Sequence, residues 1–200
     1  MTEDDARAYA GEKLTSQQVL QLETLIDSLA KENERQNLVS RETLSEVWAR
    51  HVVDSLQLSP FLSEATFSGI DLGSGAGFPG LVLAIARPEV KFDLVDSRRL
   101  RVEWLTSAIA ALQLPNCRAI QSKVERWEGR YDVITARAFA PLERLVAVSE
   151  HLAHGGSLWV LPKGKNGTSE LAELKRPDMV FHVEQSESSP ESSILLGQYR

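Results

Sequence analysis

Four glycines within eight residues are the feature of this sequence that most directly indicates chemistry. They lie in the stretch IDLGSGAGFPG, residues 70–80, with Asp71 two residues before the first of them. Glycine permits positive φ angles and lets the backbone approach a ligand without a Cβ in the way. In a doubly wound sheet, the first strand-to-helix turn lies at the edge where ligands bind. The stretch therefore predicts a ligand-binding loop. Its glycines are Gly73, Gly75, Gly77 and Gly80.

The glycines fit two cofactor-binding patterns that share two residues. Gly75, Gly77 and Gly80 form G-x-G-x-x-G, the fingerprint of dinucleotide-binding loops. Gly73, Gly75 and Gly77, preceded by Asp71, form D-x-G-x-G-x-G, which is typical of S-adenosylmethionine methyltransferases. The first pattern implies hydride transfer and the second implies methyl transfer, so the register of the loop decides the chemistry.

Three arguments favour the methyl donor. The strand should end at Leu72, which makes Gly73 the first turn residue and starts the dinucleotide register two residues late. Pro79 removes an amide donor from the helix start, where a pyrophosphate would bind. Only about 120 residues follow the loop, too few for a full dinucleotide fold with a substrate domain. The ammonium and sulfonium charges of S-adenosylmethionine instead suit the Asp71 carboxylate, and a dinucleotide enzyme is kept as a minor alternative.

Short apolar segments alternate with helical patterns from residue 67 onward. This alternation predicts a parallel sheet covered by helices on both faces. Two late segments flank the polar turn QSESSPE and predict an antiparallel edge. The expected fold class is α/β, a doubly wound, mostly parallel, Rossmann-like sheet of the class I S-adenosylmethionine-dependent methyltransferases. Strands are expected at residues 67–73, 91–96, 116–121, 131–137, 155–164, 178–184 and 192–199, and helices at residues 79–87, 100–114 and 141–154.

Two helices are expected before the sheet begins. Residues 16–37 carry apolar residues at helical spacing, and Thr15 with Gln18 forms a capping box. A second helix is expected to start at Thr43, with Glu46 as its reciprocal cap, and to stop near residues 59–60. The chain is thus divided into an N-terminal helical cap, residues 1–66, and a methyltransferase core, residues 67–200.

Composition bounds the cellular setting. The single cysteine, Cys117, excludes an internal disulfide and suits a reducing compartment. No apolar run is long enough for a membrane span, and the acidic N-terminus does not resemble a targeting signal. We therefore expect a cytoplasmic protein without a membrane partner, acting as a monomer. The net charge is −6, yet residues 71–200 balance at sixteen acidic and sixteen basic side chains, so a local basic face is compatible with the total.

The sequence resembles the RsmG (GidB) family of bacterial methyltransferases, which act on N7 of a guanosine in 16S ribosomal RNA. The resemblance spans roughly residues 20–165, and the tail matches less clearly. It is carried by six segments in the family's order and spacing: RHVVDSL (50–56), DLGSGAGFPGLVLAI (71–85), LVDSRRLRVEWL (94–105), VERW (124–127), ARAFAPL (136–142) and LPKGK (161–165).

The resemblance implies a set of cofactor contacts. Asp71 would support the amino-acid end of S-adenosyl-L-methionine, and Asp96 would accept from both ribose hydroxyls. Val124 and Glu125 would lie along the adenine. Arg137 would hold the cofactor's carboxylate or an RNA phosphate. The product would be S-adenosyl-L-homocysteine. The full set implied is Asp71, Gly73, Gly75, Gly77, Phe78, Asp96, Val124, Glu125 and Arg137.

Acid–base machinery is not obvious, which fits N7 chemistry. Guanine N7 bears no proton, so methyl transfer needs alignment rather than a general base. No residue is assigned as catalytic, with Arg137 the one candidate. The residue pair His51 and Asp54 shares a helix face and is interpreted as a polar pair that joins cap and core. No metal site is expected, because His151 and His154 lack a third ligand.

Basic residues follow two of the expected strands, on the same rim as the glycine loop. They are candidates for docking 16S ribosomal RNA through its phosphates. Because the first 70 residues are acidic, we expect recognition within an assembled or partly assembled small-subunit particle. A methyltransferase of small molecules or proteins, and a non-enzymatic interaction module, stay open as alternatives. The docking candidates are Arg98, Arg99, Arg101, Lys163 and Lys165.

Overall fold

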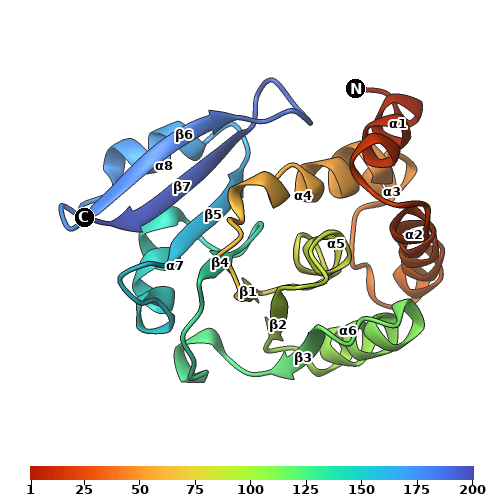
Figure 1. The fold of residues 1–200 in the computed structure, drawn as a ribbon, viewed down its shortest axis with the longest axis horizontal. Helices are drawn as coiled ribbons and strands as arrows, with labels where there is room; N and C mark the ends of the chain where they lie inside the picture. The colour runs from red at the N-terminus through yellow and green to blue at the C-terminus, as the bar shows by residue number, and fades with distance from the viewer.

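A seven-stranded sheet runs through the centre of the computed structural model, which describes residues 1–200 (Figure 1). Its strand order is β3-β2-β1-β4-β5-β7-β6, in which β1 to β5 are parallel and β7 is antiparallel to both β5 and β6. The expected doubly wound sheet with an antiparallel edge is confirmed. The strands are β1 (Ser68–Leu72), β2 (Lys91–Asp96), β3 (Cys117–Gln121), β4 (Val133–Thr135), β5 (Leu158–Lys163), β6 (Met179–Gln185) and β7 (Ser193–Tyr199).

Helices cover both faces of this sheet (Figure 1). No helix combines the length and the apolar composition that crossing a membrane requires. Short helical turns occur at Ser59–Phe61, Val124–Arg126 and Glu150–Leu152, and a π-helical turn occurs at Trp48–Val53. The α-helices are α1 (Glu3–Lys13), α2 (Ser16–Gln36), α3 (Arg41–Ser45), α4 (Asp54–Leu56), α5 (Gly80–Ala86), α6 (Arg99–Leu112), α7 (Leu142–Ser149) and α8 (Gly167–Glu173).

Two hydrophobic clusters, one on each face, hold the sheet between its helices. The larger joins buried side chains of α1, α2, α5 and α6, such as Leu25 and Leu105. The other packs α7 against the opposite face, around Leu142 and Trp159. Because both faces are covered, the central strands are buried almost continuously, as in Phe92–Asp96 of β2.

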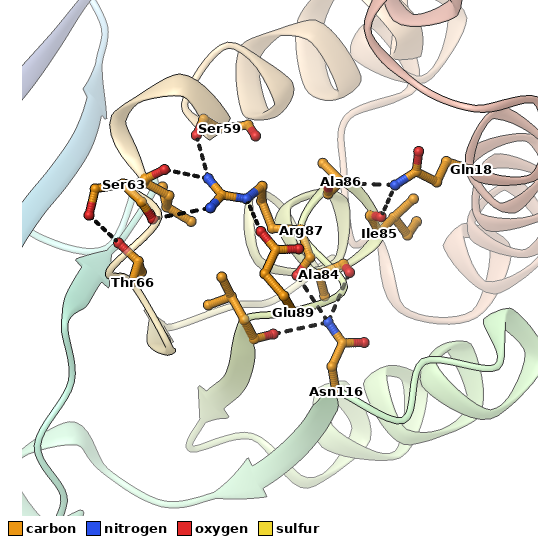
Figure 2. Close-up of polar contacts among 12 residues, drawn as sticks. Gln18, Ser59, Ser63, Thr66, Ala84, Ile85, Ala86, Arg87, Glu89 and Asn116 are labelled. Carbon is orange, nitrogen blue, oxygen red and sulfur yellow. Dashed lines mark hydrogen bonds and ion pairs between the residues drawn. The ribbon is translucent and has the colours of Figure 1, made fainter.

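The C-terminal end of α5 is capped by side chains from distant segments (Figure 2). Gln18 of α2 donates from Nε2 to the carbonyl of Ile85 at 2.8 Å. Asn116, before β3, donates from Nδ2 to the carbonyls of Ala84 and Val90, each at 3.0 Å. The bonds to Ala84 and Ile85 satisfy carbonyls that a helix end leaves without partners, and the bond to Val90 ties the segment before β2 to Asn116. They fix the helix that follows the glycine loop directly.

Arg87, just after α5, ties the same point to the preceding helical turn (Figure 2). Its guanidinium donates to the carbonyls of Ser59 and Ser63, at 3.1 and 3.2 Å, and to that of Leu62. Glu89 pairs with the same side chain. The N-terminal helices and the sheet core are therefore joined by specific polar contacts as well as by packing.

The expected capping box of α2 is confirmed, because Thr15 and Gln18 bond each other's backbone amides. The predicted start of the second helix, at Thr43, was wrong. Ser40 is the N-cap of α3, with its Oγ accepting from the Thr43 amide at 3.1 Å, so the helix starts at Arg41. A π-helical turn, not a continuous α-helix, then carries the chain toward residue 56.

Glu3 explains how this π-helical turn is accommodated. No helix was predicted for the acidic N-terminus, yet α1 lies against the turn, and Glu3 accepts from the amides of Trp48 and Ala49 at 3.1 and 2.9 Å. Side chains of residues 1–66 share one hydrophobic cluster with α5 and α6. The division into a cap, residues 1–66, and a core, residues 67–200, stays a prediction.

Candidate functional site

The glycine loop takes the backbone conformation that its composition predicts. Glycine is needed at Gly73 for two reasons, because its φ is +66° and a Cβ there would lie 2.6 Å from Cδ2 of Phe139. The amides of Gly73 and Ser74 donate to the carbonyl of Val95, at 2.8 and 3.1 Å, which holds the turn at the carboxyl end of β2. Positive φ angles occur at Gly73, Gly75 and Gly77.

Gly77 and Gly80 serve packing in this structure. A Cβ at Gly77 would lie 2.3 Å from Cδ1 of Leu81, and one at Gly80 would lie 2.3 Å from Cδ2 of Leu94. Neither glycine lines the cavity described below. A direct cofactor contact by Gly77 therefore stays a prediction, and its absent side chain already has a structural reason.

Asp71 lies beneath the loop with no exposed surface. Its Oδ2 accepts from the Gly80 amide at 3.2 Å, while Oδ1 is buried without a partner. Burial raises the pKa of the Asp71 carboxyl to about 7. An unpartnered carboxylate oxygen beside a glycine turn is the feature that would accept a cationic group.

A cavity of about 310 Å³, called here the loop cavity, opens at the carboxyl ends of β1 and β2. It brings together four of the predicted cofactor residues: Gly73, Asp96, Val124 and Glu125. Asp96 is largely buried, and its carboxylate accepts from the amides of Gly75 and Arg98 at 3.1 and 2.8 Å. These bonds orient the carboxylate at the cavity wall, so the sequence interpretation of Asp96 has a geometric basis.

Two predicted RNA-docking residues, Arg98 and Arg101, line this same cavity. Arg101 Nη1 lies 3.7 Å from Asp96 Oδ2. Arg99 instead pairs with Glu103 on the exposed side of α6. Six further residues, which the sequence did not point to, line the cavity. The missed residues are Val95, Ser97, Ser122, Lys123, Phe139 and Arg144. Phe139 lies within the quoted ARAFAPL segment, so its aromatic side chain was an available signal.

Arg137 and Phe78 line no part of the loop cavity. Arg137 lies in a second cavity of about 610 Å³, called here the Arg137 cavity, between the π-helical turn, the ends of β4 and β5, and the β6–β7 loop. Its Nη1 lies 3.1 Å from the Arg50 carbonyl and 3.4 Å from Asp54 Oδ2. Its guanidinium lies over the Phe78 ring. Burial lowers the Arg137 pKa, while Asp54 opposes that shift.

His51 stacks on Phe78, with the ring centroids 5.0 Å apart and the planes 19° apart. Neither ring nitrogen has a hydrogen-bond partner. Burial, aided by the positive charges of Arg137 and Arg50, lowers the pKa of His51 to about 3, so the ring is neutral. No bond joins His51 to Asp54, but each contacts the core, His51 through Phe78 and Asp54 through Arg137.

Asp54 instead connects three parts of the chain. Besides Arg137, its carboxylate accepts from Ser188 of the β6–β7 loop at 2.9 Å and from Gln57 at 3.2 Å. Gln57 also accepts from the Glu187 amide at 2.7 Å. One wall of the Arg137 cavity is thus held in place by α4 and the residue after it.

The cations of the Arg137 cavity fall into two groups. Lys163, a predicted RNA-docking residue, is mostly buried and donates to Glu170 at 2.8 Å and to the Ala140 carbonyl at 3.2 Å. Lys165 is exposed and has no bonded partner. Arg50, which the sequence analysis did not single out, lines the cavity with its side chain exposed. No cluster of three His, Cys, Asp or Glu side chains in the chain could hold a metal ion.

Comparison with known proteins places the chain in a family. Residues 18–193 match the GidB family model, described as rRNA small subunit methyltransferase G. A protein named ribosomal RNA small subunit methyltransferase G from Erythrobacter litoralis is 48% identical, covering 100% of this chain and 97% of its own length. The protein of the same name from Novosphingobium aromaticivorans is also 48% identical, covering 99% of this chain and 89% of its own.

Solved structures share the fold at low sequence identity. A methyltransferase from Geobacter sulfurreducens aligns over 88% of both chains, with 12% identity and a TM-score of 0.58. A SAM-dependent methyltransferase from Aquifex aeolicus covers 72% of this chain and 90% of its own, with 12% identity and a TM-score of 0.56. These likenesses support the Rossmann-like fold. Because the family model covers most of the chain and full-length relatives reach 48% identity, the chain belongs to the GidB family of rRNA small subunit methyltransferase G proteins.

Proposed function

We propose that this chain transfers a methyl group from S-adenosylmethionine to N7 of a guanosine in 16S ribosomal RNA. The observation that carries the proposal is that the two cavities border one short segment, residues 137–140. Phe139 lines the loop cavity, whereas Arg137, Ala138 and Ala140 line the Arg137 cavity. A donor in one cavity and an acceptor in the other would therefore be neighbours.

S-adenosylmethionine is the cofactor, and it supplies a methyl group activated by a sulfonium charge. The residues of the loop cavity fit this group. The Asp71 carboxyl is buried beneath Gly73 and does not line the cavity, so in its ionised form it would act on the cofactor's cationic end through the loop. Asp96 supplies acceptors for the ribose hydroxyls, and the buried Val124 supplies an apolar face for the adenine. Glu125, in the same helical turn, would accept from the exocyclic amine.

The choice of N7 rests on the groups that border the Arg137 cavity. Guanine N7 carries an in-plane lone pair and no proton, so no residue has to act as a base. His51 is neutral but has both ring nitrogens buried, which does not suit a proton shuttle. Arg137 is a donor only and would pair with the guanine O6 beside N7, where adenine has an amine.

Methylation at a pyrimidine carbon is disfavoured by the position of the one cysteine. That reaction needs a thiolate nucleophile next to the target base. Cys117 is the first residue of β3, so it lies at the amino end of that strand, whereas the glycine loop lies at the carboxyl ends of the parallel strands. Cys117 lines neither of the two cavities. Burial raises the pKa of its thiol, which keeps it protonated.

The proposed RNA partner is 16S ribosomal RNA within an assembled or partly assembled small subunit. The protein is proposed to act on it in the cytoplasm as a monomer. The relatives bear the name ribosomal RNA small subunit methyltransferase G. The net charge of −6 opposes tight binding to free RNA, because phosphate contacts supply much of such affinity. The proposed contacts are Arg98, Arg99, Arg101, Lys163 and Lys165.

Transfer of labelled methyl groups tests this proposal. Small subunits from cells that lack the protein, and free 16S RNA from the same cells, are incubated with enzyme and labelled donor. We expect label on the RNA of the particles and less on free RNA. No label on either RNA, or label on a polypeptide or metabolite instead, contradicts the proposal. Sedimentation of the purified protein tests the monomer.

A further inference from the structure

Four basic side chains line the Arg137 cavity, and they differ in how their charges are compensated. Arg137 pairs with Asp54, and Lys163 pairs with Glu170. Arg50 and Lys165 have no bonded partner for their side chains, and both are exposed. They come from different parts of the fold, Arg50 from the π-helical turn and Lys165 from the segment after β5. The compensated charges therefore belong to the less exposed pair and the uncompensated ones to the exposed pair.

The positive charge of Arg50 is also unfavourable for its neighbours in the free protein. It contributes to the lowered pKa of both His51 and Arg137, so the three groups lie within electrostatic range. Asp54, the carboxylate that partly offsets this charge, is already bonded to Arg137 and Ser188. An anion at the mouth of the cavity would relieve this excess of positive charge.

We propose that Arg50 and Lys165 bind the phosphates that flank the target nucleotide, one on each side of the cavity mouth. This assignment rests on the proposed function. When an enzyme receives its target base in a pocket, the base leaves its stack and the flanking phosphates lie outside that pocket. Two exposed cations on separate walls match this requirement, because such contacts fix the strand without reading its sequence.

The local structure holds Arg50 where such a contact needs it. Its backbone carbonyl accepts from Arg137, and the π-helical turn that carries it is capped by Glu3. The next residue, His51, is stacked on Phe78 of the glycine loop. A phosphate bound by Arg50 would therefore be placed relative to the cofactor loop through a short chain of contacts. The arginines at 98, 99 and 101 do not offer this, because Arg98 and Arg101 line the loop cavity and Arg99 is paired with Glu103 away from both cavities.

The salt dependence of binding tests the assignment. Small ribosomal subunits from cells that lack the protein are titrated with wild type, Arg50→Gln, Lys165→Gln and Lys175→Gln at several salt concentrations. Lys175 is a matched control, because it is exposed, has no bonded partner and lines neither cavity. The slope of log affinity against log salt reports the number of phosphates contacted. Arg50→Lys shows whether charge alone is enough.

We expect Arg50→Gln and Lys165→Gln each to lower the magnitude of the slope by about 1 and to weaken binding about tenfold at low salt. Affinity for S-adenosylmethionine should stay at the wild-type value in both variants, which shows that they are folded. Slopes equal to those of wild type and Lys175→Gln overturn the assignment. Failure of the wild-type protein to bind or methylate the particles contradicts the proposed function itself, and so the two failures are distinguishable.

Discussion

The guanidinium of Arg137 lies over the face of Phe78, 5.4 Å from the ring centroid. Phe78 belongs to the glycine loop, and Arg137 follows β4, so this contact joins the loop to the wall of the Arg137 cavity. His51 packs on the same ring. A planar cation is favoured there, because guanidinium groups stack on aromatic faces while also donating in plane.

Replacing Arg137 with lysine should therefore impair catalysis although the charge is kept. Lysine cannot both stack on Phe78 and reach the Arg50 carbonyl and Asp54 in one geometry. We expect kcat/KM for methyl transfer to fall about 10- to 100-fold, a loss of about 1.4 to 2.7 kcal/mol of transition-state stabilisation. Arg35→Lys, in an exposed ion pair with Glu32 that lines neither cavity, is the matched control. Equal rates for Arg137→Lys and wild type would show that the stacked geometry does not matter.

Gly73→Ala should weaken cofactor binding. The positive φ disfavours any Cβ, and the added methyl group would lie 2.6 Å from the Phe139 ring, which lines the loop cavity. We expect the Kd for S-adenosylmethionine, measured by calorimetry, to rise at least tenfold, because about 1 to 3 kcal/mol of strain falls on the loop. Gly155→Ala is the control, since nothing lies within 4 Å of its added methyl and its φ is not positive. An unchanged Kd for Gly73→Ala argues against this loop as the cofactor site.

Asp71 should make the folded protein less stable as pH rises. The pKa of the folded carboxyl is about 7, against 3.8 when solvated, so the folded state binds the proton more tightly. The contribution of this carboxyl to the free energy of unfolding is therefore fully present below pH 4 and is lost between about pH 4 and pH 7. Asp71→Asn keeps an acceptor for Gly80 but cannot ionise. Relative to this variant, wild type should lose roughly 2 to 3 kcal/mol of unfolding free energy between pH 5 and pH 8.

Urea unfolding of the two proteins at each pH measures this difference. The lowered pKa of His51 acts in the opposite direction, destabilising the fold as pH falls, but it is common to both proteins and cancels. Parallel curves for wild type and Asp71→Asn would mean that the Asp71 carboxyl titrates at its ordinary pKa.

Asp96→Asn should weaken only the ribose part of cofactor recognition. The amides of Gly75 and Arg98 orient the carboxylate, and asparagine replaces one of its two oxygens with an NH2 group that cannot accept from a ribose hydroxyl. We expect the Kd for S-adenosylhomocysteine to rise about tenfold, equivalent to about 1.4 kcal/mol. An analogue that lacks the ribose hydroxyls should bind the two proteins with similar affinity. A tenfold loss for this analogue as well would assign Asp96 to the loop rather than to the ribose.

The elements that position the site were predictable because their signals are local. The residues of β2, KFDLVD, form the strand that the sequence indicates, and the capping box at Thr15 starts α2 as expected. The cluster of Gly73, Asp96, Val124 and Glu125 around one cavity was also predictable, since parallel strands bring their carboxyl ends to one edge.

The features that could not be predicted depend on contacts between residues far apart in the sequence. The π-helical turn depends on Glu3, which is 45 residues from Trp48 along the chain. Arg50 looked like any exposed helix residue until β5 and the β6–β7 loop enclosed the cavity beside it. Lys163 looked free in the sequence, although Glu170 compensates its charge.

Mapping the methylated atom is the most direct test of the account. Small-subunit RNA from cells that lack the protein, treated with purified enzyme and donor, is digested and analysed by mass spectrometry. We expect one added methyl group per 16S RNA, recovered as N7-methylguanosine, and none with an Asp71→Ala or Gly73→Val enzyme. A methyl group on another atom or another base would contradict the central claim.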